Sequence, residues 1–348
     1  MAFRFNNIEI SNFRGIDHLE INGFKNLNVF VGANNVGKTS VLEAIFMLSG
    51  MSNPLMPTRI NSLRAQSLAN NIDGVRFLFH DLDFSNKPLL KACSNEGTRR
   101  LTFEPVVDND DNTQASVSSS LPVVKRLDFH FGTDDGDDFP YHTSLFLNRE
   151  NNLEQTFDRN YREQTNCLFL PADKNDGNAL VNFAALVKRN AKQIVVNTLR
   201  SFDESIEMIE ALPDGLYIKT KNIDELLPIC MAGDGVRRMV GIIASIANED
   251  NNIVLIDEID NGLHYSAHKK MWTAIMNFVK KHDVQLFATT HNIDCLLGLN
   301  KVIEENEDLG NLVNVYDIAK TRVNGYQAYK YSSRELSEAI EKEIEIRK

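Results

Sequence analysis

Residues 27–45 read LNVFVGANNVGKTSVLEAI, and the fold can be inferred from the pattern they contain. The stretch opens with Leu27–Val31, apolar except for Asn28, which predicts a buried strand, and it closes in a helical pattern from Thr39 to about Ser49. Between the two lies Gly32–Thr39, which satisfies the phosphate-loop pattern G-x-x-x-x-G-K-[ST] in full. The sequence therefore predicts a strand, a phosphate-binding loop and a helix in direct succession.

This loop contains the residue types that phosphate binding requires. Gly32 and Gly37 permit a tight turn whose backbone N–H groups point inward. Lys38 places a cation on the β- and γ-phosphates, Thr39 offers a hydroxyl to Mg²⁺, and the helix N-terminus favours an anion. We predict that the cofactor-binding residues of the loop are Gly32, Asn34, Asn35, Val36, Gly37, Lys38, Thr39 and Ser40.

A second motif is the apolar run Ile253–Ile256 followed by Asp257 and Glu258. A strand that is buried on both faces explains the apolar run. Acids at its carboxyl end lie where open α/β sheets bind ligands. Together with the phosphate loop, this pattern predicts that Asp257 holds Mg²⁺ through water and that Glu258 polarises the attacking water as general base.

The composition excludes several classes of function. The chain has 348 residues, 43% apolar and 24% charged, which is ordinary for a globular protein of one large or two modest domains. Its net charge of −11 argues against a protein built to coat nucleic acid or an anionic membrane. Lys188, Arg189, Lys192 and Arg200 could line one side of a helix and meet phosphates, but a solvated helix face is the favoured explanation.

Cysteine spacing and hydropathy indicate the compartment. Cys93, Cys167, Cys230 and Cys295 lie far apart and form no CxxC pair, so reduced thiols fit better than a zinc site or a disulfide framework. The N-terminus does not resemble a signal peptide, and no apolar stretch approaches the roughly 20 residues that span a bilayer. We expect a cytoplasmic protein with no membrane partner.

The rest of the chain predicts β-hairpins followed by alternating helices and strands. Strands are expected at 101–107, 126–131 and 143–147, and again in a hairpin at 206–212 and 216–219. Helices are expected at 177–200, 236–247, 266–281 and 335–348, with a strand at 284–289. The alternation in the last third is typical of a parallel sheet.

The order of these motifs resembles the ABC-class ATPase heads of RecF, SMC proteins and OLD-type phage-defence ATPases. Ile10–Gly15, ISNFRG, is similar to the start of those heads, and residues 27–45 are close to the small bacterial AAA-type ATPases around OLD. The resemblance covers residues 3–49 and 228–300. It implies an α/β fold, an ABC-type P-loop NTPase head with a mixed sheet, an antiparallel β lobe and a helical signature subdomain.

The resemblance also implies domain boundaries. Residues 1–100 would form the first half of the ATPase head, 101–229 the antiparallel β lobe and helical insertion, and 230–348 the second half with its C-terminal helix. Sustained heptads of the SMC type are missing from the sequence. Only 57 residues follow His291, too few for the nuclease domain of full OLD proteins.

Further site residues follow from the resemblance. Met231–Arg238 occupies the position of the signature loop, in which Gly233 replaces the usual serine and the backbones of Gly233 and Gly235 would reach the γ-phosphate on a partner subunit. His291 matches the switch histidine, Asp260–His264 matches the D-loop that touches the partner, and Arg14 is a candidate contact to nucleotide phosphate or base. Without the resemblance, a plain turn and a structural histidine would explain these residues.

Two other patterns stay open or are set aside. The Q-loop could lie at Gln66 or at His80–Asp83, and neither spacing settles it. The acids Asp108, Asp110 and Asp111 resemble a metal site, but their polar, Ser-rich surroundings favour a solvated loop.

The sequence thus predicts an ATPase that converts ATP and water to ADP and phosphate, with ATP and Mg²⁺ as cofactors. Its catalytic residues would be Glu258, Lys38 and His291, and its metal ligands Thr39 and Asp257. By resemblance it would dimerise, or form a higher oligomer, around nucleotide and control a separate effector, a nuclease or toxin, in antiphage defence. A RecF-like DNA-repair accessory is the first alternative, and a P-loop small-molecule kinase or GTPase is the second.

Overall fold

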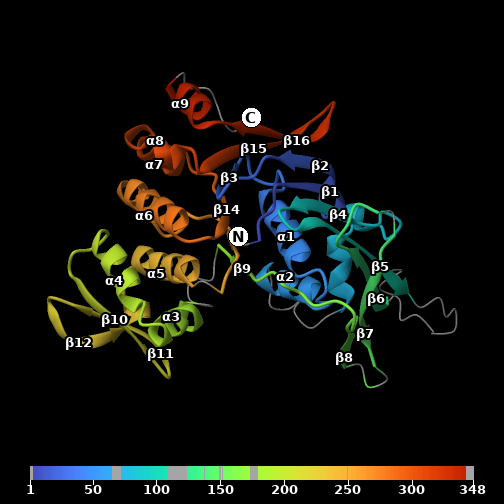
Figure 1. The fold of residues 1–348 in the computed structure, drawn as a ribbon, viewed down its shortest axis with the longest axis horizontal. Coiled ribbons are helices and arrows are strands. Elements are labelled where there is room, and N and C mark those ends of the chain that lie inside the picture. Colours follow the sequence, from blue (N-terminus) through green and yellow to red (C-terminus); the bar gives the residue numbers. More distant parts are fainter. Residues whose placement is uncertain are drawn as a thin grey trace, which may run out of the picture.

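The fold is known from a computed structural model, which describes residues 3–64, 72–107, 124–136, 138–148, 150, 152–172, 179–248 and 250–341. Within these residues three sheets are present, with six, seven and three strands. Figure 1 shows the six-stranded core sheet in the middle of the molecule, an antiparallel lobe on one side and a smaller helical lobe on the other.

The core sheet has the strand order β16-β15-β3-β14-β13-β9. Strands β15, β3, β14, β13 and β9 pair in parallel, and β16 pairs antiparallel with β15 at the edge. The bounds are β3 Leu27–Val31, β9 Cys167–Leu170, β13 Ile253–Ile256, β14 Gln285–Thr289, β15 Val313–Thr321 and β16 Gly325–Tyr331. The predicted strands at 27–31 and 253–256 are confirmed, and the one at 284–289 begins one residue later.

Side-chain alternation places a hydrophobic core on each face of this sheet. In β3, Leu27, Val29 and Val31 face one core, and Phe30 faces the other. The first core is covered by α5 (Asp234–Ala247), α6 (His268–Lys281) and α7 (Ile293–Glu305), which stack beside the sheet in Figure 1. The second contains α1 (Lys38–Ser49). Because both faces are covered, the strands need continuous apolar runs.

The seven-stranded sheet is antiparallel throughout, with the order β2-β1-β4-β5-β6-β7-β8. Its bounds are β1 Asn7–Phe13, β2 Ile16–Asn22, β4 Leu89–Ser94, β5 Gly97–Val107, β6 Val124–Gly132, β7 Tyr141–Leu147 and β8 Leu153–Thr156. The predicted hairpin strands are therefore present. The lobe also takes strands from residues 7–22 and 89–94, so it extends beyond the 101–229 interval.

The helical lobe contains α3 (Ala179–Lys188), α4 (Lys192–Arg200) and a three-stranded sheet of β10 (Ile206–Leu212), β11 (Gly215–Thr220) and β12 (Ile223–Pro228). The prediction of one helix over 177–200 is wrong. Asn190 has a left-handed φ of 56°, and the backbone N–H of Ala191 donates to the carbonyl of Leu186 at 2.8 Å. This is the geometry of a helix C-terminus, and it separates α3 from α4.

The remaining elements surround these layers. They are α2 (Met56–Arg64), α8 (Glu307–Gly310), α9 (Ser333–Glu341) and the 3₁₀ helices η2 (Ile72–Leu78), η3 (His80–Leu82), η4 (Ile229–Met231) and η5 (Tyr265–Ala267). In the described part of the chain, no helix has the length and apolarity to cross a membrane. The expected fold class, an ABC-type P-loop head with a mixed sheet, an antiparallel lobe and a helical subdomain, is confirmed.

Candidate nucleotide site

The phosphate loop leaves the carboxyl end of β3 and enters α1. Gly32 and Gly37 have φ of 131° and 90°, and Asn35 has φ of 63°, so three of its residues use backbone conformations that L side chains rarely adopt. The Lys38 ammonium donates to the carbonyls of Gly32 at 2.9 Å and Ala33 at 2.7 Å. The lysine therefore lies across its own loop, where the phosphates of a nucleotide would compete for it.

Gly32 is the residue of this loop that tolerates substitution least. A Cβ atom there would lie 2.4 Å from the backbone carbonyl oxygen of Ile318 in β15, in addition to the strained φ. We expect Gly32→Ala to lower the free energy of unfolding by about 2 kcal/mol or more and to abolish ATP binding. Urea denaturation and calorimetry would check this. Gly136→Ala is the control, because its nearest neighbour would be at an ordinary 3.5 Å; equal losses in both variants would contradict the steric argument.

The two predicted metal ligands meet across the core sheet. The Thr39 hydroxyl lies 3.0 and 3.1 Å from the two carboxylate oxygens of Asp257, although 218 residues separate them. The Thr289 hydroxyl donates to the same carboxylate at 2.6 Å. Thr289 ends β14, the strand between β3 and β13, so the sheet topology brings all three side chains to one edge. The sequence analysis did not identify Thr289.

Glu258 lies beside this cluster in a strained conformation. Its φ is 45°, unusual for a residue with a side chain, and its backbone N–H donates to the Thr289 hydroxyl at 2.8 Å. The turn presents the carboxylate at the surface, 42% exposed, with Nδ1 of His291 3.5 Å from its Oε1. The structure thus brings Glu258 and His291 together beside Thr39 and Asp257, as the motif order implied.

Arg238 connects this acidic turn to the signature helix. It is almost fully buried in α5, and its guanidinium donates to the backbone carbonyls of Pro171 at 2.8 Å, Asp257 at 2.7 Å and Glu258 at 3.2 Å. The signature helix is thereby fixed to the turn that carries both acids. In the sequence, Arg238 is visible only as an arginine at the start of an apolar helix face. No spacing rule indicates the partners of such an arginine.

Arg14 has a partner within the chain. Its Nε lies 2.5 Å from Oε2 of Glu43, and its side chain is only 9% exposed. Burial lowers the pKa of Arg14 to about 10, so the guanidinium stays charged at neutral pH. Glu43, itself buried, also accepts two hydrogen bonds from Arg64 at 2.7 and 3.0 Å. The three residues link the β1–β2 turn, α1 and α2; contact between Arg14 and nucleotide stays a prediction.

A cavity of about 530 Å³ borders the start of α1. Two predicted cofactor-binding residues, Arg14 and Ser40, contribute to its wall. The other lining residues are Gly15, Asn61, Arg64, Phe77, Phe79, Asp81 and Leu82. The cavity therefore adjoins the phosphate loop and combines cationic with aromatic groups.

The signature loop has the geometry of a helix entry. Gly233 caps α5 with extended φ and ψ of −60° and 149°, and a Cβ there would contact nothing within 4 Å. Gly235 packs on the D-loop, since a Cβ at this position would lie 3.3 Å from the Gly262 carbonyl. In the D-loop, Asp260 accepts a hydrogen bond from Thr290 at 2.6 Å and is buried, whereas Asn261 and Gly262 are exposed.

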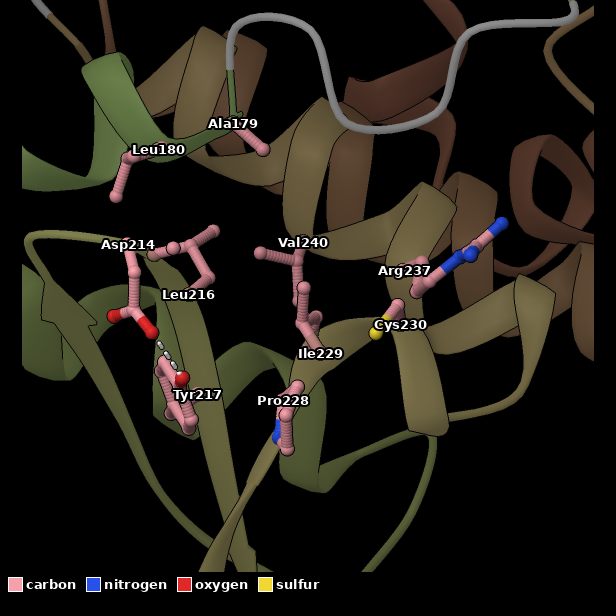
Figure 2. A pocket seen from close by; sticks show the side chains of 11 residues that line it. Ala179, Leu180, Asp214, Leu216, Tyr217, Pro228, Ile229, Cys230, Arg237 and Val240 are labelled. Atoms are coloured by element: carbon pink, nitrogen blue, oxygen red, sulfur yellow. Dashed lines mark hydrogen bonds between the residues drawn. The ribbon is translucent and has the colours of Figure 1, made fainter.

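A second cavity, of about 270 Å³, lies beside the start of α5 (Figure 2). Its walls are largely apolar, and the Tyr217 hydroxyl is directed at Asp214, with which it forms a 2.6 Å hydrogen bond. The Arg237 side chain points away from the cavity and pairs with Asp234. The remaining lining residues are Ala179, Leu180, Gly215, Leu216, Pro228, Ile229, Cys230 and Val240. This cavity contains no phosphate-loop residue.

The basic residues of 188–200, the Q-loop candidates and the acidic cluster can also be located in the structure or placed outside it. Arg189 pairs with Asp250, Lys192 pairs with Glu210, and Arg200 donates to two backbone carbonyls, so these cations are engaged within the chain. His80 bonds through Nδ1 to the Arg14 carbonyl at 3.0 Å. Gln66, Asp108, Asp110 and Asp111 lie outside the described residues.

Comparisons with known proteins agree with this geometry. The protein-family comparison matches residues 27–296 to the family described as "AAA domain, putative AbiEii toxin, Type IV TA system". The chain belongs to this AAA-domain family, and its fold and motifs define it as a P-loop ATPase of the ABC class.

The same comparisons identify individual proteins and structures that are similar to this chain. The chain is 23% identical over 331 residues to an "ATP/GTP phosphatase" of Helicobacter pylori, covering 86% of this chain and 88% of that protein. It is 59% identical over 46 residues, 13% of each chain, to the DNA replication and repair protein RecF of Geobacter sulfurreducens. Among solved structures, it is similar to an SMC head bound to the C-terminal winged-helix domain of ScpA, with a TM-score of 0.49, 13% identity and coverage of 97% and 99%.

Proposed function

We propose that this ATPase binds Mg–ATP at the edge of the core sheet and hydrolyses it slowly, as a switch. One observation carries the proposal. Thr39, which follows Lys38 at the end of the phosphate loop, is in direct hydrogen-bond contact with Asp257, at the carboxyl ends of β3 and β13 on either side of β14. Ligands bind at this edge in open α/β sheets.

The residues at this edge fit a magnesium ion. Thr39 and Asp257 supply oxygen donors, which Mg²⁺ prefers, and the described residues contain no group of three histidine, cysteine or acidic side chains that would suit another metal. A bound Mg²⁺ would neutralise charge on the β- and γ-phosphates. Thr289 fixes the Asp257 carboxylate in position for this role, and the Lys38 ammonium would leave its loop carbonyls for the phosphates.

Glu258 and His291 supply the acid–base part of the site. The exposed carboxylate of Glu258 can accept a proton from a water molecule that attacks the γ-phosphate. His291, 3.5 Å away, can hydrogen-bond to the same carboxylate or to the phosphate. The nucleoside would enter the cavity beside Ser40, where the ring of Phe77 and the guanidinium groups of Arg14 and Arg64 can contact base and ribose.

We further propose that closure requires a second copy of the chain. Gly233 and Gly235, at the N-terminus of α5, would donate backbone N–H groups to the γ-phosphate bound by the partner subunit. Gly233 has open space around it, and Arg238 on the same helix holds the acidic turn, so closure would act on the hydrolytic site. The dimer would thus exist in open and nucleotide-clamped states.

The output of this switch would be a separate effector, a nuclease or toxin, in cytoplasmic antiphage defence. The family description, which names a toxin of a toxin–antitoxin system, supports this setting. A RecF-like role at DNA is not favoured. The RecF similarity covers 13% of the chain, the net charge is −11, and Arg189, Lys192 and Arg200 are engaged within the chain.

Substitutions at Gly233 test the sandwich. Gly233→Ser adds the hydroxyl donor that related loops carry, so Mg–ATP should drive more dimer than in wild type, by about fivefold for one added hydrogen bond. Gly233→Glu places a negative charge against the partner's phosphate and should prevent dimerisation. Light scattering with and without Mg–ATP measures both.

The open space at Gly233 makes the experiment selective. Neither variant meets an atom of its own chain through the new Cβ, so both should melt like wild type and bind ATP as single subunits. Lys38→Ala is the matched control for lost nucleotide binding. Dimerisation of Gly233→Glu at the wild-type level would refute the head-to-tail sandwich, and absence of ATP binding by the wild type would refute the whole proposal.

A further inference from the structure

Asp317 is a buried acid beside the phosphate loop that the mechanism above does not use. It lies in β15 opposite Val31, the last residue of β3 before the loop. Asp317 is only 6% exposed, and its Oδ1 accepts no hydrogen bond within the described part of the chain. A buried carboxylate oxygen without a donor is costly, so its presence calls for a functional explanation.

The orphaned oxygen is directed at the loop itself. A Cβ atom on Gly32 would lie 3.1 Å from Oδ1 of Asp317, so the carboxylate lies against the first residue of the phosphate loop. Lys38, which donates to the carbonyl of that same glycine, is the cation that stabilises the charged form of Asp317. The acid and the lysine therefore both lie against Gly32.

Within the described residues, Lys38 is the cation whose charge acts on Asp317, and the neighbouring strand β16 contributes tyrosines. Tyr329 lies opposite it in the β15–β16 register, and Tyr331 follows in the same strand. Burial and the charge of Asp317 both raise the pKa of Tyr331, so this phenol stays neutral. Burial raises the pKa of Asp317 itself to about 6, against the opposing effect of Lys38. Lys38 thus favours the charged form of this carboxylate, and burial opposes it.

We propose that Asp317 restrains Lys38 while the loop is empty and takes up a proton from solvent when a nucleotide phosphate draws the lysine away. Asp317 is then a positioning residue that couples nucleotide affinity to proton concentration. This inference rests on the ATP binding proposed above. Nucleotide removes the cation and adds negative charge nearby, and both effects favour the protonated acid. Linkage then requires nucleotide affinity to fall as the pH rises above about 6.

Asp317→Asn is the matched variant, because it keeps the shape of the side chain and removes its charge. We would measure the Kd of Mg–ADP by calorimetry from pH 5.5 to 8.5 for wild type and variant. At pH 8 the variant should bind about tenfold more tightly, which corresponds to a change of one unit in the pKa of Asp317 on binding. At pH 5.5 the two affinities should converge. Titration of the nucleotide is common to both proteins and cancels in the ratio.

Asp308→Asn is the control for a general effect of charge. Asp308 is an exposed acid in α8, which precedes β15 at the end remote from the loop, so its removal should leave affinity and pH dependence unchanged. An Asp317→Asn protein that binds Mg–ADP more weakly than wild type, or with the same pH dependence, would overturn the inference and leave ATP binding intact. A wild-type protein that binds no Mg–ADP at any pH would refute the proposed function as well.

Discussion

Glu258→Gln should lower the rate of ATP hydrolysis by about 10²- to 10⁴-fold, the usual contribution of a general base. ATP binding should persist, because the phosphate loop, Thr39 and Asp257 are unchanged. The amide keeps the shape of the side chain but cannot take a proton from water. The clamped dimer should therefore accumulate with Mg–ATP, and light scattering beside a phosphate-release assay would record both effects.

Lys38→Ala is the control that distinguishes accumulation of the clamped dimer from a general loss of function. That variant should neither hydrolyse ATP nor dimerise, whereas Glu258→Gln should fail only in hydrolysis. If Glu258→Gln hydrolyses ATP as fast as wild type, the general base is another group. If its mass is unchanged by Mg–ATP, the oligomer either does not form through nucleotide or is permanent.

Glu43→Gln should lower the free energy of unfolding by about 3–5 kcal/mol, the cost of leaving a buried charge without its partner. Arg14 is 9% exposed and has Glu43 as its carboxylate partner, at 2.5 Å. The pKa of Arg14, about 10 after burial, prevents the guanidinium from escaping this cost by losing a proton at neutral pH. Urea denaturation at pH 7 would measure the loss.

Arg64→Gln provides the comparison within the same cluster. The Arg64 side chain is 44% exposed, so its removal leaves Glu43 paired with Arg14 and should cost about 1 kcal/mol or less. Equal destabilisation by Glu43→Gln and Arg64→Gln would contradict the view that burial of the Arg14 charge dominates. Because Glu43 lies one turn beyond Thr39 in α1, we also expect Glu43→Gln to weaken Mg–ATP binding.

The fold was predictable where a local pattern determined it. The bounds of β3 and β13 follow from apolar runs that end at Gly32 and Asp257. Strand β15 was not predicted, since Asn314 and Asp317 interrupt its apolar pattern and no motif comparable to the phosphate loop after β3 marks its end. Both are buried through tertiary contacts: Asn314 donates to the Gly23 carbonyl at 2.7 Å, and Asp317 lies against the phosphate loop.

The candidate site divides in the same way. Lys38, Thr39, Asp257 and Glu258 lie in contiguous motifs, so the sequence could name them. Thr289, Arg238 and Glu43 act through partners that are distant in the sequence, and no spacing rule indicates such contacts. The prediction of one long helix over 177–200 was wrong at Asn190, where the backbone is left-handed and the helix ends. Hydrophobic periodicity does not indicate such an end, because it depends on local backbone hydrogen bonds.

The position of β3 between β14 and β15 has a consequence for biosynthesis. The ribosome makes this strand long before its two neighbours, which are encoded by residues 285–289 and 313–321. Pairing over such distances is slow and leaves the strand exposed to aggregation in the meantime. In the finished fold, α1 and the β1–β2 hairpin pack in the core that Phe30 of β3 joins, so we expect them to shield this strand during translation. A chain that stalls before residue 285 cannot assemble the sheet around its phosphate loop, so unfinished copies would be unable to clamp ATP.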